Sequence, residues 1–200
     1  DNTKVIDVSD ESSDLELCPT NYDTPLEFTA AFNFIRTQPD LRPSYLEWQA
    51  ERLAIASQMV PLPVPTPEGR DEHVGEPKTL NGFIVCGSVS KSKLYNEKLR
   101  EINRALLAVE TESGGIFAQA KYHGNTPAIS IRGISDYADK DKKKLEQVSK
   151  GGVRQLAASN AASFLRLQIS NRFFLTALVH RRSGHQTQLA LSDAPVVTTG

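Results

Sequence analysis

Residues 127–136 read Pro-Ala-Ile-Ser-Ile-Arg-Gly-Ile-Ser-Asp, and this stretch decides which fold the chain is expected to adopt. The run from Pro127 to Ile131 is rich in β-forming residues, so it predicts a strand. Asp136 follows that run closely. Because open α/β sheets bind their ligands in a crevice at the carboxyl ends of the strands, Asp136 is expected at such an edge.

The sequence around this stretch alternates between strand-like and helix-like segments. Short apolar runs predict two further strands, at 82–87 and 106–109. Helices are predicted at 93–104, 116–120 and 152–169, and the last of these has one apolar face. This alternation predicts an α/β fold with a mixed central sheet flanked by helices.

The first part of the chain has a different sequence pattern. It opens with an acidic, polar segment that contains a short strand-like run at 5–8. Two helices follow at 26–36 and 45–59. The first of them is predicted to begin behind Thr24 as the cap, with Pro25 at the first helical position.

A prolyl segment at 61–67 separates the two parts of the chain. It can be neither a helix nor a central strand, so an extended loop or linker is expected. Residues 1–78 are then either the middle of a domain with insertions or something unrelated, and 79–170 form the α/β core. Residues 171–200 are expected to be a terminal apolar element followed by a flexible tail.

Composition excludes several classes of protein. The 200 residues carry a formal net charge of −1, which gives no electrostatic case for nucleic acid or an anionic membrane as a partner. No apolar run approaches the length of a membrane-spanning helix. The two cysteines, Cys18 and Cys86, suggest no disulfide framework, so a reducing cytoplasm is expected. The start lacks an initiator Met, and we read it as a cut or processed end, which would make this sequence a piece of a longer chain.

Three short pieces carry the functional signal. They are Gly-Phe-Ile-Val-Cys-Gly-Ser at 82–88, Val-Glu-Thr-Glu-Ser-Gly-Gly-Ile at 109–116 and Ile-Ser-Ile-Arg-Gly-Ile-Ser-Asp-Tyr-Ala-Asp at 129–139. Together they resemble the carboxyl-terminal half of the nucleoside phosphorylase and nucleosidase family, whose corresponding patterns are Gly-x-Ile-x-Ser-Gly-Asp/Asn, Val-Glu-Met-Glu and Val-x-x-Arg-x-Ile-Ser-Asp-x-Ala-Asp. The third piece is the most specific. The resemblance implies a phosphorylase-like α/β fold, of which this chain is the carboxyl-terminal part, and cleavage of the N-glycosidic bond of a purine nucleoside or nucleotide.

Asp136 is the candidate catalytic residue. An anionic purine leaves poorly, so cleavage is helped by a carboxylic acid that protonates the base near N7. The resemblance implies this role for Asp136, and partial desolvation at the sheet edge is expected to raise the pKa of its carboxyl. The alternative is that Asp136 only caps a helix.

Glu112 is the candidate ribose ligand. A carboxylate that accepts hydrogen bonds from the 2′- and 3′-hydroxyls would orient the sugar and stabilise the positive charge that grows on it. The resemblance implies this role for Glu112, next to Thr111, which stands where the family has a Met against the ribose. The alternative is a solvated carboxylate that favours a helix N-terminus.

The remaining candidates support the site or line its base pocket. Cys86, Gly87 and Ser88 stand where the family's strand borders the base, and Ser88 replaces an Asp or Asn. Arg132 and Ser135 are expected in supporting roles, with Arg132 paired to a buried carboxylate rather than to substrate. No metal site or cofactor is expected, although phosphate could be a co-substrate.

The resemblance leaves the nucleophile open between water and phosphate, because the part of the family's fold that supplies it has no counterpart here. It also implies a homo-oligomer. The third piece is most similar to versions found in large multidomain defence and signalling proteins, which points to an effector or sensor domain. The rival reading is a non-catalytic module of the same fold that binds a purine nucleoside or nucleotide.

Overall fold

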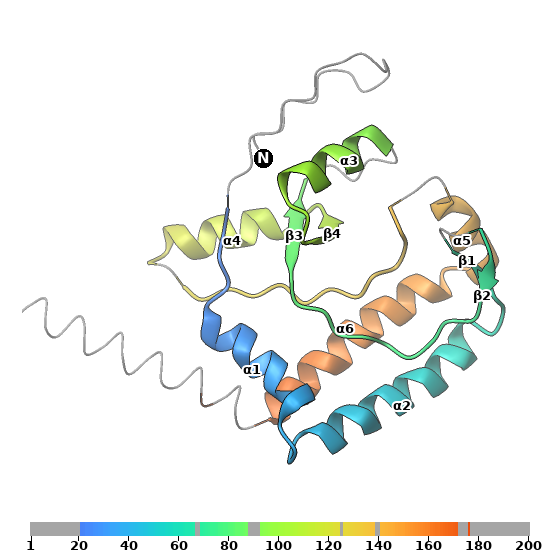
Figure 1. Cartoon of the computed structure of the whole chain (residues 1–200), viewed down its shortest axis with the longest axis horizontal. Coiled ribbons are helices and arrows are strands. Elements are labelled where there is room, and N and C mark those ends of the chain that lie inside the picture. The colour runs from blue at the N-terminus through green and yellow to red at the C-terminus, as the bar shows by residue number, and fades with distance from the viewer. Residues whose placement is uncertain are drawn as a thin grey trace, which may run out of the picture.

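The computed structural model describes residues 21–66, 69–87, 93–124, 126–138, 141–171 and 176 (Figure 1). The strand expected at 5–8 lies outside these residues, as do the tail and all but Thr176 of the apolar run at 173–179. The chain is a mixed α/β structure, about 54% helical, with two small sheets. None of the helices in the described ranges is long and apolar enough to cross a bilayer.

Two helices form where the first part of the sequence predicts them. Helix α1 spans Leu26–Thr37 and helix α2 spans Arg42–Met59. Pro25 occupies the cap position of α1, one residue later than expected, and no side chain caps that end. Helix α2 begins three residues earlier than expected because Pro43 falls in its first turn, where a backbone N–H has no intrahelical partner to lose.

Helices α1 and α2 pack against α6, Gly152–Ser170, to form the main hydrophobic core. The ring of Trp48 in α2 lies 5.3 Å from that of Phe164 in α6, and the ring of Phe32 in α1 lies 5.7 Å from the ring of Phe164. The indole N–H of Trp48 donates to the Ser163 hydroxyl at 3.0 Å. Helices from before and after the prolyl segment therefore share one core.

The prolyl segment is packed against this helical part of the molecule. Strand β1, Val64–Pro65, pairs antiparallel with β2, Asp71–Glu72. Both are edge strands, which is where proline is tolerated. Val64 is buried in a second apolar cluster with residues of α2, α6 and helix α5, Lys142–Ser149.

The α/β part is built on a parallel pair of strands. Strand β3, Phe83–Cys86, and strand β4, Leu106–Glu110, are joined through helix α3, Lys93–Ile102, and β4 leads into helix α4, Ser113–Tyr122. These elements confirm the strands and helices predicted for this region. Cys86 and Glu110 are partners in the register, so both strands end at the same edge.

The strand predicted at 127–131 is wrong. Residues 126–138 have no regular secondary structure and run from the end of α4 toward α5 (Figure 1). They lie on α6: Ile129 and Ile131 pack against the main core, and a Cβ on Gly133 would lie 2.0 Å from the carbonyl oxygen of Ala157. The apolar residues of this run are thus partly buried by helix packing rather than in a ladder. Instead of the expected mixed central sheet, the described residues form two separate two-stranded sheets.

Candidate functional site

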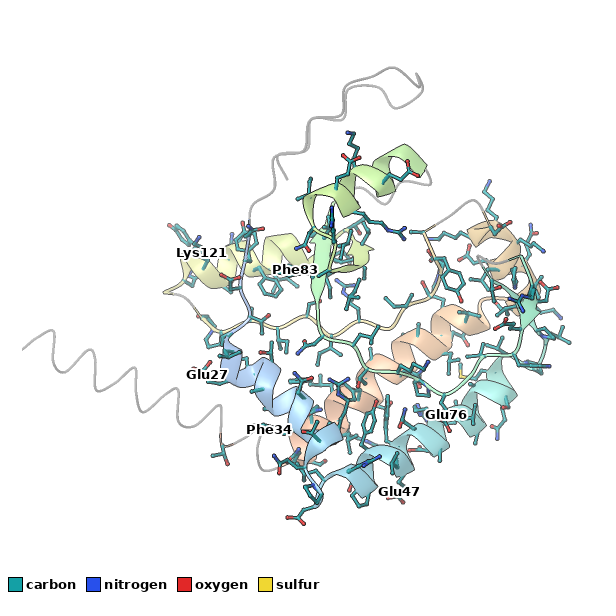
Figure 2. All side chains as sticks on the ribbon, in the orientation of Figure 1. Glu27, Phe34, Glu47, Glu76, Phe83 and Lys121 are labelled. Atoms are coloured by element: carbon teal, nitrogen blue, oxygen red, sulfur yellow. The ribbon has the colours of Figure 1, made fainter. Side chains whose placement is uncertain are left out.

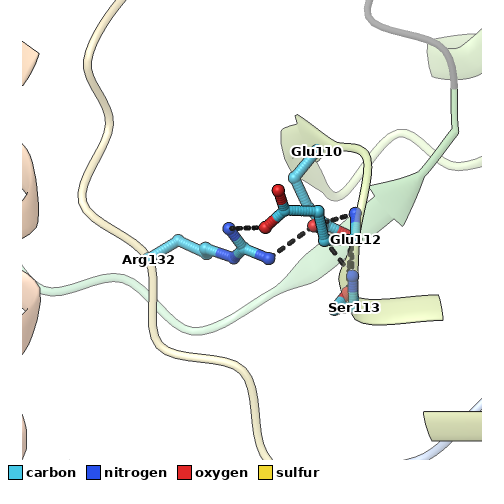
Figure 3. Close-up of polar contacts among 4 residues, drawn as sticks. All are labelled: Glu110, Glu112, Ser113 and Arg132. Atoms are coloured by element: carbon cyan, nitrogen blue, oxygen red, sulfur yellow. Dashed lines mark hydrogen bonds and ion pairs between the residues drawn. The ribbon is translucent and has the colours of Figure 1, made fainter. Parts of the chain in front are cut away.

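The candidate site lies where β3 and β4 end and α4 begins. Figure 3 shows Glu110, Glu112, Ser113 and Arg132 meeting there, with Arg132 reaching in from the 126–138 segment. Glu110 is the last residue of β4, and Ser113 is the first of α4. Two stretches that are distant in the sequence, residues 110–113 and the 126–138 segment, therefore meet at the carboxylate of Glu110.

Glu110 is buried and accepts several hydrogen bonds. Its carboxylate receives the backbone N–H groups of Glu112 at 2.8 Å and of Ser113 at 3.0 Å, and the hydroxyl of Ser113 at 2.5 Å. These N–H groups belong to the start of α4, where a helix lacks internal acceptors and favours a negative charge. The guanidinium Nη2 of Arg132 lies 2.5 Å from the same carboxylate.

These contacts fix the charge of Glu110. Burial alone would raise the pKa of Glu110, but the hydrogen bonds from Ser113, Glu112 and Cys86 outweigh it and lower the pKa to about 2. Glu110 is therefore an anion whose acceptors are already engaged. It holds the start of α4 and positions Arg132, as expected for Arg132 from the sequence.

Glu112 is in the opposite situation. Its side chain is 79% exposed, and its carboxylate lies 4.0 Å from Nη1 of Arg132. Thr111 beside it is exposed as well. The structure thus places both predicted ribose-binding residues at the carboxyl edge of the parallel strands, with the carboxylate of Glu112 turned toward a fixed cation (Figure 3).

The predicted base-pocket residues are joined to Glu110. The thiol of Cys86 hydrogen-bonds to Glu110, and burial, followed by that hydrogen bond, raises the pKa of the thiol. The N–H of Gly87 donates to the carbonyl of Glu110 at 2.7 Å. Gly114 of α4 packs on Cys86, since a Cβ there would lie 3.0 Å from the sulfur. Ser88 lies outside the described residues.

Asp136 is held by a different set of partners. Its carboxylate accepts the Ser135 hydroxyl at 3.0 Å and the Ala138 N–H at 3.0 Å, and Nζ of Lys142 lies 3.2 Å away. The contact with Ala138 is a local turn rather than a helix cap, because α5 starts at Lys142 with Asp141 at its cap position. Ser135, expected in a supporting role, thus contacts Asp136 through its hydroxyl.

The expectation of a raised pKa for Asp136 is wrong. Burial does raise the pKa, but the hydrogen bonds from Ala138, Lys142 and Ser135 and the charge of Lys142 outweigh it, so the pKa is lowered. Partial burial of Asp136 after an apolar run could be inferred from the sequence. The cation at the start of α5 could not, because its position depends on tertiary packing.

The space beside Asp136 is small. A hollow of about 10 Å³, enough for about one water molecule, lies between Asp136, α5 and α6. Within the described ranges, no hydrogen bond or ion pair joins Asp136 to Glu110 or to the residues that contact Glu110. The structure therefore brings Cys86, Gly87, Glu112 and Arg132 together, and it places Asp136 with Ser135 against α5.

Sequence reasoning placed Ser113 at a helix start near the ligand, but it assigned no site role to Glu110, Ser113 or Lys142. Glu110 had a usable signal, because a carboxylate at the end of an apolar strand and before a serine can accept the first N–H groups of a helix. Lys142 had none, since it lies in a charged run typical of a solvated helix entrance.

No protein-family model, curated protein or solved structure matches this chain. The likeness to nucleoside phosphorylases thus rests on the three sequence pieces. What the protein does is inferred from them together with the placement of Glu112, Arg132 and Asp136.

Proposed function

We propose that this protein binds a purine nucleoside or nucleotide and cleaves its N-glycosidic bond by hydrolysis or phosphorolysis. The observation that carries the proposal is the contrast between Glu110 and Glu112 at one sheet edge. Glu110 is buried and engaged, whereas Glu112 is exposed and lies 4.0 Å from Arg132. An exposed carboxylate held near a cation at the carboxyl ends of parallel strands is suited to accept two ribose hydroxyls.

The roles of the two carboxyl groups differ in this proposal. Glu112 stabilises the positive charge that develops on the ribose as the bond to the base lengthens. Protonated Asp136 gives its proton to N7 of the purine, and the electron pair of the C1′–N9 bond moves to the base. Phosphate forms the new bond at C1′, or water forms it and releases a proton to solvent. Asp136 must therefore take up a proton before each turnover.

The 126–138 segment connects the surroundings of Glu112 with those of Asp136. Arg132 and Asp136 lie four residues apart on one segment, which Gly133 seats on α6. Arg132 is fixed at its far end by Glu110 at 2.5 Å. A ligand bound at Glu112 is thus flanked by a segment that also carries Asp136.

Exposed apolar residues on the parallel sheet support the expected homo-oligomer. Phe83, labelled in Figure 2, is 56% exposed, and Leu107 on the neighbouring strand is 45% exposed. Parallel sheets are ordinarily covered on both faces, so this surface suits contact with another copy or with further parts of the chain. We place the protein in the cytoplasm as an effector domain of a multidomain defence or signalling protein.

The experiment that tests the activity is release of free base. The protein is incubated with adenosine, inosine, guanosine, AMP and ATP, with and without phosphate, and the products are separated by chromatography. We expect free base from the native protein, loss of more than about 100-fold in Asp136→Asn, and a similar loss in Glu112→Gln. A requirement for phosphate would identify phosphorolysis.

The second candidate function is a non-catalytic module that binds the same ligands. The lowered pKa of Asp136 favours it, because an ionised carboxylate cannot donate a proton. A purine nucleoside or nucleotide that raises the melting temperature without releasing base in any condition would support this module and contradict the enzyme.

A further inference from the structure

The ion pair between Asp136 and Lys142 joins the predicted catalytic segment to α5. Nζ of Lys142 lies 3.2 Å from Oδ2 of Asp136, and the two side chains are 30% and 14% exposed. Lys142 is the first residue of α5. The contact therefore depends on how α5 packs beside the 126–138 segment.

The charged groups around Asp136 come from both helices that line its hollow. Lys142 and Glu146 belong to α5, and Arg154 belongs to α6. Arg154 forms an ion pair with Glu146, so the positive charge of Arg154 is engaged there. Lys142 is left as the cation that contacts Asp136 directly.

The other contacts of Asp136 hold it in place. Ala138 adopts a left-handed backbone conformation with φ of 55°, which an alanine rarely adopts, and its N–H donates to Oδ1 of Asp136. Ser135 donates to Oδ2. Asp136 is thus fixed by its own loop, whereas Lys142 reaches it with a long, flexible side chain.

From this geometry we propose that Lys142 controls the ionisation of Asp136. By favouring the carboxylate form, Lys142 opposes the protonation that Asp136 needs in order to act as an acid. In the ligand-free protein the N–H of Ala138, Lys142 and the hydroxyl of Ser135 together favour the carboxylate form of Asp136, and Lys142 is the one of these three that carries a charge. The second half of the proposal rests on the proposed function: cleavage requires Asp136 to bind a proton from solvent, and the ion pair with Lys142 opposes that step. Loss or displacement of Lys142 makes protonation easier.

The test compares Lys142→Met with two controls. Lys142→Arg keeps a cation at this position, and Lys143→Met removes the charge of an exposed neighbour on the same helix. The pKa of Asp136 is measured in the full chain by carboxyl-carbon NMR titration, with the signal assigned by its absence in Asp136→Asn. Thermal unfolding checks that each variant is folded.

We expect Lys142→Met to raise the pKa of Asp136, and Lys142→Arg and Lys143→Met to leave it near the native value. Base release by Lys142→Met at neutral pH should rise about 3- to 10-fold, because a larger fraction of Asp136 is protonated. The activity of Lys142→Met should also extend to higher pH.

The possible failures are distinguishable. An unchanged pKa of Asp136 in a folded Lys142→Met variant overturns the inference. A raised pKa with no base release by the native protein or any variant contradicts the proposed function, while control of Asp136 by Lys142 stands. A raised pKa with unchanged or reduced base release shows that Lys142 does not oppose catalysis.

Discussion

The helical core and the candidate site are held together by different forces. In the core, aromatic rings of α1, α2 and α6 pack on one another and exclude water. At the site, one buried carboxylate, Glu110, ties together a strand end, a helix start and Arg132 through hydrogen bonds and charge. Apolar packing tolerates changes in pH, whereas the site depends on the ionisation of a few groups.

The largest expected effect comes from breaking the core. Trp48→Ala removes a buried ring that contacts Phe164 and Tyr45, so it should lower the free energy of unfolding by about 4 kcal/mol. The loss should be similar at about pH 7 and about pH 3, because no ionisable group is removed. Urea unfolding measures it, with Trp48→Phe as a milder control. A loss confined to neutral pH would contradict the comparison.

Removing the charge of Glu110 should lower the free energy of unfolding somewhat less than Trp48→Ala does. The folded pKa of Glu110 is about 2, below its ordinary value of 4.5, so its stabilising contribution is full above about pH 4.5 and is lost as pH falls toward 2. Glu110→Gln should therefore lower the free energy of unfolding by about 3 kcal/mol at neutral pH.

That loss should shrink as the pH falls, which separates Glu110→Gln from Trp48→Ala. Urea unfolding at about pH 7 and about pH 3 provides the measurement. Glu101→Gln is a matched control, since Glu101 is exposed and its ion pair with Lys98 should contribute little. An equal loss at both pH values would mean that the charge of Glu110 does not stabilise the fold.

The smallest of these effects tests the packing of the 126–138 segment, which carries site residues, on α6 of the helical core. Gly133→Ala would place a methyl group 2.0 Å from a backbone oxygen of α6, so the segment that carries Arg132 and Asp136 must move away. We expect a loss of about 2 kcal/mol, measured by thermal unfolding. In Gly115→Ala, the control in α4, the new methyl group has no neighbour within 4 Å, so this change should be neutral or stabilising. Equal stability of Gly133→Ala and the native protein would show that the segment is not seated on α6.

Local patterns predicted most of the described elements. The apolar run around Val85 and the alanine-rich stretch around Ala157 form a strand and a helix as expected, because their spacing and flanking glycines act over a few residues. The run at 127–131 did not follow its local preference. Burial of its isoleucines against the helical core replaced the strand pairing that composition alone favours.

In the candidate site, too, some features follow from the local sequence and others from tertiary packing. The sequence by itself determined which carboxylates stand at the ends of apolar segments, and hence that Glu112 lies beside the ends of β3 and β4. Only the tertiary structure decided that Arg132 pairs with Glu110, that Lys142 pairs with Asp136, and that the pKa of Asp136 is lowered. The reason is that the ends of β3 and β4 follow from neighbouring residues, whereas the charge state of a carboxyl group depends on which cation the packing of distant segments places within a few ångströms of it.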